Sequence, residues 1–378
     1  MNVIILSHER SLNKAEGLLN ALSDQNVHIV LDKSASKEDK PYIKLANNII
    51  VSKGFNVIDI ISKVKHCDKI WCVSENLLPI QSQLESYYGI DNLSSFAAEV
   101  LSNKQNFDDY CRSIGLGGFV PDSVTPTFHS QLDRFKNKEI FSKPDIGTGS
   151  NVFFPGDNQN TPKIEYRRWN NKHHFLKHLK DKQSHNEFFD INKQGIHTKR
   201  FNFKTCRIMF QEYFWSEEPS IAPIGHVSNG IVNTEFYLKM SKVKYGDHIW
   251  VVTPNEVDEK IRAQIEFFMN TVIKSLKVKE LFFAGPDFHI SNEKLIAIDF
   301  NPRPGQFMNI LDQLSSNSIF SPIVHNTPVV MKKKLLWGCA TLTPGKITNI
   351  SNIEKLTTYF NAQNTTLVVG MNIIKTLS

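Results

Sequence analysis

The sequence predicts a protein of the α/β class whose first lobe holds a parallel sheet. Over its full length the chain is of the α+β type, because further strands and helices follow that lobe. Short apolar stretches rich in β-branched residues alternate with helical stretches over the first 95 residues. This alternation is typical of parallel strands joined by helices. Further along, the chain carries a hairpin pattern and a C-terminal segment of short strands. A chain of 378 residues with this organisation predicts two or three compact lobes.

The bulk composition is that of an ordinary globular protein. Apolar residues make up 40% and charged residues 22%, and the formal net charge is +6. A charge of this size fits an anionic small ligand as well as a nucleic acid. The five cysteines are scattered without the spacing of a zinc or redox site, which indicates reduced thiols. No stretch has the length of a membrane helix or the core of a signal peptide, so we expect a cytoplasmic protein.

The elements of the first lobe follow from the apolar pattern. It predicts helices at 12–22, 57–64 and 77–88 and strands at 2–6, 27–31, 48–51 and 69–73. We therefore assign residues 1–95 to an N-terminal α/β domain.

The middle of the chain predicts a longer series of elements. It contains a helix at 104–114, a Gly- and Pro-rich connector at 115–126, strands at 139–143 and 207–214, and a long amphipathic helix at 257–276. We assign 96–324 to a central domain, with a subdomain at about 140–210, and 325–378 to a small β-rich cap.

Two polar segments have more than one interpretation. Residues 161–186 are basic and rich in histidine, which fits a nucleic-acid or metal patch, but a solvated helix face with Phe175, Leu176 and Leu179 turned inward is favoured. A second segment is expected to be a loop, either facing substrate or merely exposed. Its polar residues are Lys239, Lys242, Lys244 and His248.

The segment Leu281–Gly305 predicts a β-hairpin, because two apolar strands flank a polar turn. Side chains alternate along a strand, so Asp287 shares a face with Gly285, and Asp299 shares a face with Asn301. A connection with an odd number of residues, such as 292–294, would place Asp287 opposite Asp299. A two-residue connection would put the two carboxylates on opposite faces. The apolar pattern favours the odd connection.

Two carboxylates at a cross-strand pair lie only about 5 Å apart at Cβ and repel each other. A divalent cation relieves this repulsion, and two aspartates with an amide oxygen are hard ligands suited to Mg²⁺. The pattern therefore indicates a metal site formed by Asp287, Asp299 and Asn301. The alternative is a pair of ordinary solvent-facing aspartates, with Asn301 capping a turn.

These residues resemble the ATP-grasp superfamily, whose members hold Mg-ATP with two acidic residues and a nearby asparagine. The run Asn301-Pro302-Arg303-Pro304-Gly305 resembles the ending of that motif, although the family more often has glutamate where Asp299 stands. The resemblance implies an ATP-grasp fold with ATP and Mg²⁺, two ions by analogy. The overall resemblance is to carboxylate–amine ligases with a small C-terminal cap, including amino-acid ligases and the biotin-carboxylase-like branch.

Other parts of the motif set occur in the expected order. Lys104 and Lys143 are similar to the two lysines that hold ATP phosphates. The loop with Gly147, Gly149 and Ser150 resembles the flexible flap, in which glycines let backbone N–H groups approach phosphates. The glycine that many relatives carry soon after the serine is missing here, where Asn151 and Val152 stand.

Residues 211–214 resemble the hinge that binds adenine through its backbone, with Gln211, Glu212 and Tyr213 as the contacts. The acid that holds the ribose would be Glu218, with Glu217 as a close competitor. An acidic surface loop is an equal alternative for this pair.

The resemblance implies a ligase that activates a carboxylate as an acyl phosphate and joins it to an amine. Arg303 would orient the carboxylate, and Arg207 either binds it or pairs with a core acid. The alternatives are a bicarbonate-using carboxylase, a nucleotide-binding protein without ligase activity, and a nucleic-acid binder. The expected partners are small-molecule carboxylates and amines, with neither nucleic acid nor membrane, and a homodimer is left open.

Overall fold

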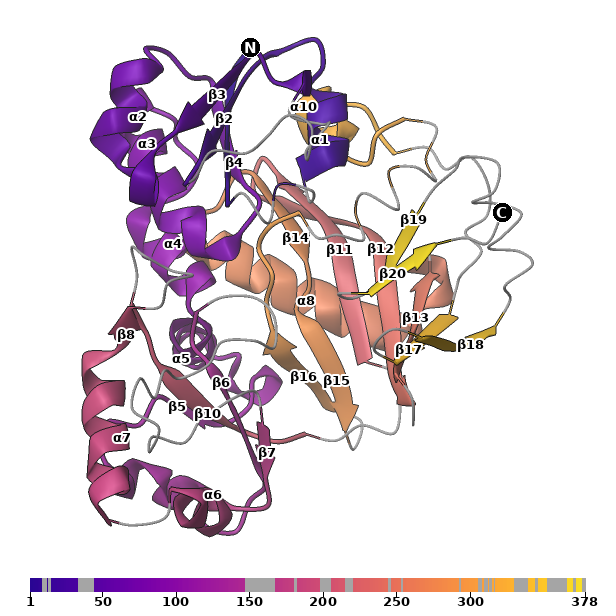
Figure 1. Cartoon of the computed structure of the whole chain (residues 1–378). Helices are drawn as coiled ribbons and strands as arrows, with labels where there is room; N and C mark the ends of the chain where they lie inside the picture. Colours follow the sequence, from indigo (N-terminus) through magenta and orange to yellow (C-terminus); the bar gives the residue numbers. More distant parts are fainter. Residues whose placement is uncertain are drawn as a thin grey trace.

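The computed structural model contains a lobe built on a parallel sheet, a smaller lobe with an antiparallel sheet, and a larger antiparallel sheet backed by a long helix (Figure 1). The structure describes the chain except for residues 9–11, 13–14, 33–43, 147–166, 180–181, 198–204, 215–219, 244–245, 253, 292–293, 305–307, 309–311, 313–314, 316, 330–338, 344–345, 352–365, 370–371 and 376–378.

Four parallel strands form the sheet of the first lobe in the order β3-β2-β1-β4. Their bounds are β1 (Asn2–Ser7), β2 (Asn26–Leu31), β3 (Asn48–Val51) and β4 (Lys69–Cys72). The central strand β1 pairs with both β2 and β4, and its residues Val3 to Leu6 are completely buried. Burial on both faces explains why these strands are continuous apolar runs. The four predicted strands are confirmed.

The helices of this lobe begin at side-chain caps that the sequence supplies. Asn56, Ser94 and Asn103 each accept a hydrogen bond from a backbone N–H in the first turn of the following helix. The helices are α1 (Glu16–Ala21), α2 (Val57–Lys63), α3 (Leu78–Tyr88), α4 (Ser95–Ser102) and α5 (Lys104–Ser113). Helix α1 is shorter than predicted. Helix α4, which begins at the predicted boundary, packs on α3, and the division into domains stays a prediction.

Short 3₁₀ turns join several of these elements. They are η3 (Lys53–Phe55), η4 (Glu75–Leu77), η5 (Gly117–Phe119), η6 (His129–Phe135) and η7 (Pro254–Glu256). Of these, η4 begins shortly after the end of β4 and carries Glu75 and Asn76, both almost completely buried. This turn therefore places two polar side chains at the carboxyl end of the parallel sheet.

The second lobe has a four-stranded sheet in the order β5-β10-β6-β7. An aromatic core formed by Trp169, Phe175, Phe188 and Phe210 lies between this sheet and helices α6 and α7. The elements are β5 (Ser123–Val124), β6 (Ile140–Pro144), β7 (Arg167–Trp169), α6 (Lys172–His178), α7 (Lys182–Gln194), β8 (Ile196–His197), β9 (Thr205–Cys206) and β10 (Ile208–Glu212). The predicted strands at 139–143 and 207–214 are confirmed as β6 and β10.

Within the histidine-rich segment, helix α6 packs over this core. Phe175, Leu176 and Leu179 are buried, as the helix-face interpretation predicts. The rings of His174 and His178 lie against Trp169. Throughout the described ranges, no group of three or more His, Cys, Asp or Glu side chains is placed to hold a metal ion.

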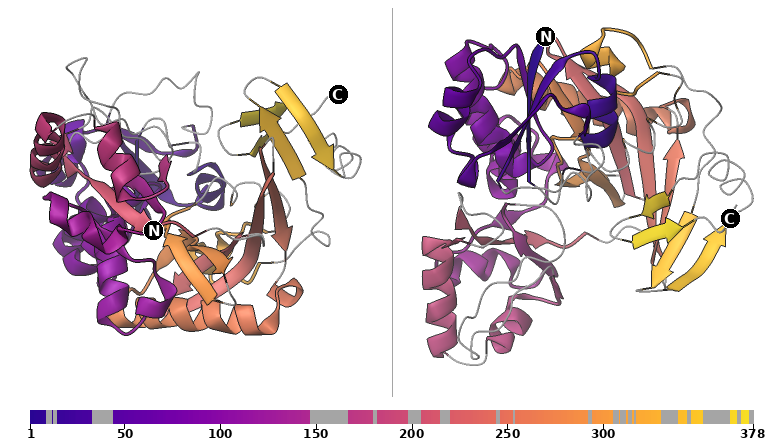
Figure 2. Two further views of the ribbon diagram at one scale, coloured as in Figure 1. Left: turned by 90° about the horizontal axis from the view of Figure 1, so that it is seen from below. Right: turned by 45° about the horizontal axis from the view of Figure 1, so that its top comes forward.

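The third sheet is antiparallel, in the order β13-β12-β11-β15-β16, and β14 also pairs with β11. Helix α8 lies along one face of it, as the left view of Figure 2 shows. The elements are β11 (Ser220–Ser228), β12 (Ile231–Val243), β13 (Gly246–Val252), α8 (Glu259–Leu276), β14 (Leu281–Ala284), β15 (Asp287–Ser291) and β16 (Lys294–Asp299). The predicted helix at 257–276 is confirmed.

The predicted polar loop before α8 is wrong, because these residues form strands. Lys239 and Lys242 lie in β12 and His248 lies in β13, where Ser241 pairs with His248. Antiparallel strands can carry polar residues on a solvated face, so their polarity does not exclude a sheet. Lys244 lies outside the described residues.

The C-terminal region contains strand pairs, which agrees with the predicted β-rich cap. The elements are α10 (Ser321–Val324), β17 (Cys339–Thr343), β18 (Lys346–Ser351), β19 (Thr366–Val369) and β20 (Asn372–Lys375). Strand β17 pairs with β18, β19 pairs with β20, and β17 lies against β13 (Figure 1). None of the helices in the described ranges has the length and apolarity needed to cross a bilayer.

Candidate active site

The hairpin β15–β16 brings two acidic side chains together. Asp287 pairs with Asp299 in the ladder, so the predicted pairing is confirmed. The predicted odd connection is wrong, because Ser291 pairs with Lys294 and only residues 292 and 293 lie between them. A bulge reconciles the two facts: the ladder passes from Phe288–Ala297 directly to Asp287–Asp299 and skips Ile298.

The bulge also creates a contact with the second lobe. The carbonyl oxygen of Ile298, the residue that the ladder skips, accepts a hydrogen bond from Lys143 Nζ at 2.7 Å. Gly285, which precedes the hairpin, has φ +136°, and a Cβ at this position would lie 3.4 Å from the Asp299 carbonyl oxygen. Glycine is therefore favoured where the chain passes behind the acidic pair.

The two carboxylates are in an environment that opposes their charge. Burial, and next the charge of Asp299, raise the pKa of Asp287 to about 7. Asp299 Oδ1 is buried and has no hydrogen-bond partner, and its cationic neighbour Lys104 Nζ is 3.7 Å away. A buried carboxylate oxygen without a donor is costly and is suited to a cation.

The residues present therefore fit Mg²⁺. Asp287 and Asp299 would supply carboxylate oxygens, and Asn301 would supply an amide oxygen that already accepts a hydrogen bond from Arg303 Nη2 at 3.0 Å. An ion held by two aspartates and one amide leaves positions for phosphate oxygens, which is the usual manner in which Mg²⁺ is bound with nucleotides.

The structure brings both predicted lysines to this acidic pair. Lys104 begins α5, and its backbone N–H donates to the Asp145 carbonyl oxygen at 2.7 Å. Lys143, in β6, is only 2% exposed. Burial lowers the pKa of Lys143, while the charges of Asp299 and Asp108 oppose this change. Two cations beside two acids form a site that can hold a polyanion together with a divalent cation.

Arg303 is held within the protein by three contacts. Its Nε donates to Glu75 Oε2 at 2.5 Å, Nη1 donates to the Pro304 carbonyl oxygen at 3.3 Å, and Nη2 donates to Asn301. Arg303 and Glu75 are both more than nine-tenths buried. The first effect of Arg303 is therefore to fix Asn301, and its contact with a substrate carboxylate stays a prediction. Sequence reasoning missed Glu75, whose partner is 228 positions away.

A small pocket lies between α5 and the hairpin and contains another acid that sequence reasoning missed. Its polar lining includes Glu75, Lys104, Asp108 and Asp299. Asp108 Oδ2 is buried without a hydrogen-bond partner, and burial raises the pKa of Asp108 to about 7. The sequence does contain one signal for this acid. Asp108 stands four positions after Lys104 on the same helix, so the two side chains lie on one face.

The predicted hinge lies at the end of β10. Gln211 is 1% exposed, and both polar atoms of its amide are buried without partners. The backbone N–H of Glu212 donates to the Asp122 carbonyl oxygen and that of Tyr213 to the Glu139 carbonyl oxygen. These two N–H groups are therefore used within the protein, and the predicted adenine contacts would have to come from other hinge groups.

The hinge is also fixed at its side chains. Glu212 pairs with Lys138 at 2.8 Å, and the guanidinium of Arg168 lies 4.5 Å from the centre of the Tyr213 ring. The Phe214 carbonyl oxygen lies 3.3 Å from His289 Nδ1. This last contact joins the hinge to the hairpin that carries the acids.

Arg207 is exposed, and its backbone contacts the core. The Arg207 N–H donates to Asp145 Oδ1 at 2.8 Å, and Asp145 N–H donates back to the Arg207 carbonyl oxygen. The backbone of Arg207 thus holds the buried acid by two hydrogen bonds. Burial raises the pKa of Asp145, and the charge of Arg207 acts against that larger effect. The predicted residues Gly147, Gly149, Ser150, Glu217 and Glu218 lie outside the described residues.

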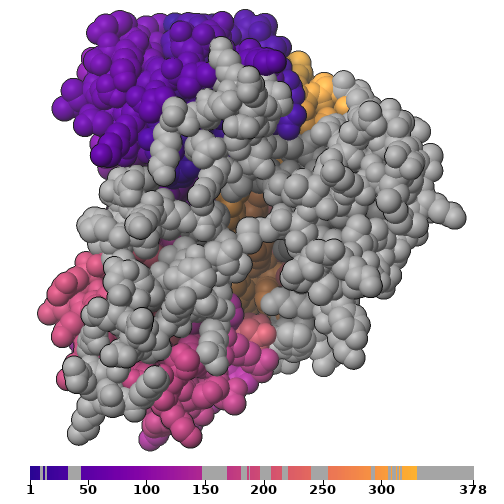
Figure 3. Space-filling model, in the orientation of Figure 1, coloured from indigo at the N-terminus to yellow at the C-terminus, as the bar shows by residue number. Residues whose placement is uncertain are grey.

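The surface view agrees with an accessible hairpin. Figure 3 shows atoms in the colour range of β15 and β16 at the floor of a hollow in the middle of one face. The acids of the hairpin lie where the second lobe meets the antiparallel sheet, since Lys143 contacts Ile298. A ligand that joins these two parts would bind at this seam.

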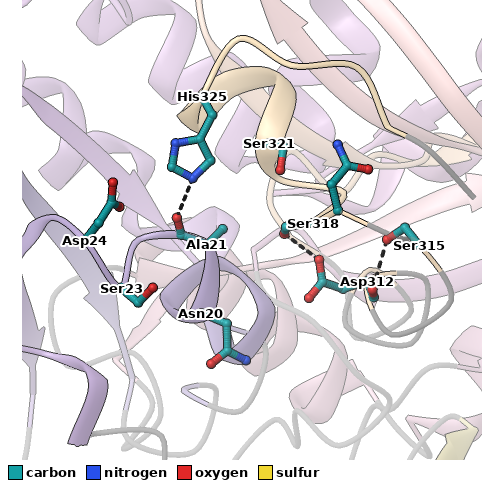
Figure 4. Close-up of a pocket in the computed structure, with 10 residues that line it drawn as sticks. Asn20, Ala21, Ser23, Asp24, Asp312, Ser315, Ser318, Ser321 and His325 are labelled. Atoms are coloured by element: carbon teal, nitrogen blue, oxygen red, sulfur yellow. Dashed lines mark hydrogen bonds between the residues drawn. The ribbon is translucent and has the colours of Figure 1, made fainter.

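A second pocket, of about 470 Å³, lies elsewhere, between the end of α1 and the region of α10 (Figure 4). There His325 Nε2 lies 2.8 Å from the Ala21 carbonyl oxygen, and Asp312 accepts a hydrogen bond from Ser318. Asp24, also in the lining, lies just before β2, at the amino edge of the parallel sheet. The described residues that line it include no lysine or arginine, the side chains that neutralise the phosphates of a nucleotide.

A parallel-sheet lobe, a small lobe that supplies Lys143 and an antiparallel sheet that supplies the paired acids define the ATP-grasp fold. An L-amino acid ligase from Bacillus licheniformis has a TM-score of 0.61 with this chain at 12% identity, over 91% of this chain and 81% of its own. N5-carboxyaminoimidazole synthetase from Staphylococcus aureus, solved with ADP, has a TM-score of 0.61 at 14% identity, over 95% and 86%.

A third structure widens the range of reactions found on this fold. Biotin carboxylase from Campylobacter jejuni has a TM-score of 0.55 at 13% identity, over 90% of this chain and 75% of its own. The chain thus has the fold of ATP-grasp ligases and carboxylases. Fold alone does not fix the reaction.

The sequence comparisons add less. No family model matches the chain. The cell division protein DivIB of Bacillus cytotoxicus is 26% identical over 171 residues, which are 43% of this chain and 64% of that protein. The chain spans less than two thirds of this relative, and the match carries no conclusion about activity.

Proposed function

We propose that this protein is an ATP-dependent ligase that activates a carboxylate as an acyl phosphate and joins it to an amine, releasing ADP and phosphate. The observation that carries the proposal is the pairing of Asp287 with Asp299 beside Lys104 and Lys143. Structural neighbours with ligase activity and bound ADP support it through the fold.

Each group has a defined task in this reaction. Lys104 and Lys143 neutralise phosphate oxygens of ATP while the γ-phosphoryl group is transferred. Mg²⁺, held by Asp287, Asp299 and Asn301, would supply positive charge against the phosphates. Arg303, fixed by Glu75, holds Asn301 in place at the end of the hairpin.

Carboxylation through bicarbonate is the second candidate, because N5-carboxyaminoimidazole synthetase and biotin carboxylase share the fold. A nucleotide-binding protein without ligase activity is the third. ATP hydrolysis that depends on bicarbonate would favour the second, and tight ATP binding without turnover would favour the third. The cytoplasmic location, the small-molecule partners and the oligomeric state stay predictions.

The test is ATP-dependent phosphate release with common amino acids, presented singly and in pairs. We expect release above the ATP-only background with at least one acid–amine combination and its loss in Asp299→Asn. Asp109→Asn is the matched control, because Asp109 is an exposed acid of helix α5 whose described partners, Gln105 and Arg112, are its near neighbours on that helix. Unchanged turnover in Asp299→Asn would contradict the assignment.

A further inference from the structure

Asp145 lies where three elements of the candidate active site meet. It directly follows β6, the strand that carries Lys143, and it is only 4% exposed. It also contacts the start of helix α5, where Lys104 lies, and Arg207, which directly precedes β10 (Figure 1). The two lysines come from different elements of the chain, and Asp145 is attached to both elements.

The contacts of Asp145 use its backbone and its side chain together. Its carbonyl oxygen accepts a hydrogen bond from the Lys104 N–H at 2.7 Å, and its Oδ2 accepts one from Asn103 Nδ2 at 3.1 Å. Its Oδ1 accepts from the Arg207 N–H, and its own N–H donates back to the Arg207 carbonyl oxygen, both at 2.8 Å. These hydrogen bonds fix the end of β6 against both α5 and β10.

Asn103 connects this acid to the helix. Its Oδ1 accepts a hydrogen bond from the Asn106 N–H at 3.0 Å and so caps α5, while its Nδ2 donates to Asp145. Serine or aspartate would cap a helix equally well, but neither has an amide nitrogen to donate to a carboxylate. The cap alone therefore does not require asparagine, and the contact with Asp145 does.

The charge of Asp145 does not explain its place beside two phosphate-binding lysines. A negative charge at this position opposes the binding of an anion. Burial raises the pKa of Asp145, and the hydrogen bonds from Arg207 and Asn103 act against this effect. What the residue contributes to the site is the geometry that its hydrogen bonds impose.

That geometry matters because both lysines reach the same hairpin. Lys104 Nζ lies 3.7 Å from Asp299 Oδ1, and Lys143 Nζ lies 2.7 Å from the Ile298 carbonyl oxygen. Two cations that contact one ligand must be correctly spaced, and a displacement of about 1 Å is enough to weaken such a site strongly. A rigid link between α5 and β6 keeps this spacing.

We propose that Asp145 is a positioning residue that sets the spacing of Lys104 and Lys143 through its contact with Asn103, so that both ammonium groups reach the phosphates of one nucleotide, an inference that rests on the proposed function. Loss of the contact leaves both lysines in place in the sequence but releases α5 from β6. Nucleotide binding then weakens in a protein that is still folded, whereas a purely structural role changes stability alone.

The two partners can be exchanged, which gives the test. In Asn103→Asp the cap is kept but two carboxylates face each other, and in Asp145→Asn two amide nitrogens do so. We expect each single variant to weaken Mg-ADP binding, measured by calorimetric titration, about 10-fold. The double variant Asn103→Asp/Asp145→Asn restores a donor opposite an acceptor, and binding should return to within about threefold of wild type.

Two further measurements separate position from charge. Asp145→Asn removes an acid near the lysines, so an electrostatic role predicts tighter binding where a positioning role predicts weaker binding. In a Lys104→Met background, Asn103→Asp should cost less than about threefold, because the ammonium group that it displaces is absent. Asn56→Asp, at the cap of α2, is the matched control and should leave binding unchanged.

The outcomes are distinguishable. Unchanged Mg-ADP binding in both single variants, or a loss that the exchange does not repair, would overturn the positioning role. Wild-type protein that does not bind Mg-ADP would overturn the proposed function, and the inference with it. If a single variant does not fold, Asn103→Ser, which keeps the cap and removes the donor, is tested instead, with the same loss of affinity expected and unchanged affinity contradicting it.

Discussion

Asp287 lies directly opposite Asp299 although the hairpin connection has only two residues, because a bulge removes Ile298 from the ladder. The bulge has two effects at once. It returns both carboxylates to one face, and it directs the Ile298 carbonyl oxygen to Lys143 of another lobe. The acidic pair and the buried Lys143 are thus positioned by a single irregularity in the strand.

The raised pKa of Asp287, about 7, predicts a pH-dependent stability in the absence of metal. At a pH well below the usual pKa of a carboxyl group, Asp287 is protonated in both the folded and the unfolded protein. The stability that this side chain contributes is lost as the pH rises from there through about 7. Asp287→Asn should therefore raise the free energy of unfolding at pH 8 by on the order of 1 kcal/mol or more. Urea unfolding at pH 5 should show a much smaller difference.

The Glu75–Arg303 pair is predicted to be strongly coupled, since both groups are almost completely buried. Glu75→Gln should lower the free energy of unfolding by about 3 kcal/mol because it leaves the guanidinium buried without a counter-charge. Adding Arg303→Met should recover part of this loss. Glu139→Gln, which breaks a half-exposed pair with Arg168, is the control for thermal unfolding and should have little effect.

Lys143 is predicted to contact phosphate. Lys143→Met should weaken Mg-ADP binding about 10- to 100-fold, which corresponds to the loss of one charge-assisted hydrogen bond. Calorimetric titration measures this directly. Lys138→Met removes a lysine of the same lobe that pairs with Glu212 at the surface, and equal losses in the two variants would argue against a specific role for Lys143.

Gln211 offers a test in which stability and binding change in opposite directions. Its amide is buried with no partner for either polar atom, so Gln211→Leu should raise the free energy of unfolding by about 1 kcal/mol. If the amide contacts the nucleotide, the same variant should bind ADP more weakly. A variant that is less stable than wild type would show that the amide is satisfied in the free protein.

Local patterns predicted much of the fold and only part of the site. The apolar alternation around Asp287 and Asp299 was enough to predict their pairing. It could not reveal the bulge, whose Ile298 carbonyl oxygen meets a lysine 155 positions away. Strands β12 and β13 were missed because their polar residues, such as Lys239, suggested a loop.

The residues missed in the site share a cause. Glu75 and Asp145 have partners that are distant in sequence, 228 positions away in Arg303 and 42 in Asn103. Their side chains look like ordinary loop residues until the fold places these partners beside them. Sequence spacing can identify a helix face or a hairpin pair, but not contacts between segments that only the fold brings together.

The central claim is that the paired acids bind the metal that accompanies ATP. Isothermal titration of ATP, with and without Mg²⁺, into wild type, Asp299→Asn and Asp109→Asn tests it most directly. We predict that Mg²⁺ strengthens ATP binding in wild type and Asp109→Asn, and that Asp299→Asn loses most of this gain. An equal effect of Mg²⁺ in Asp299→Asn and wild type would contradict the claim.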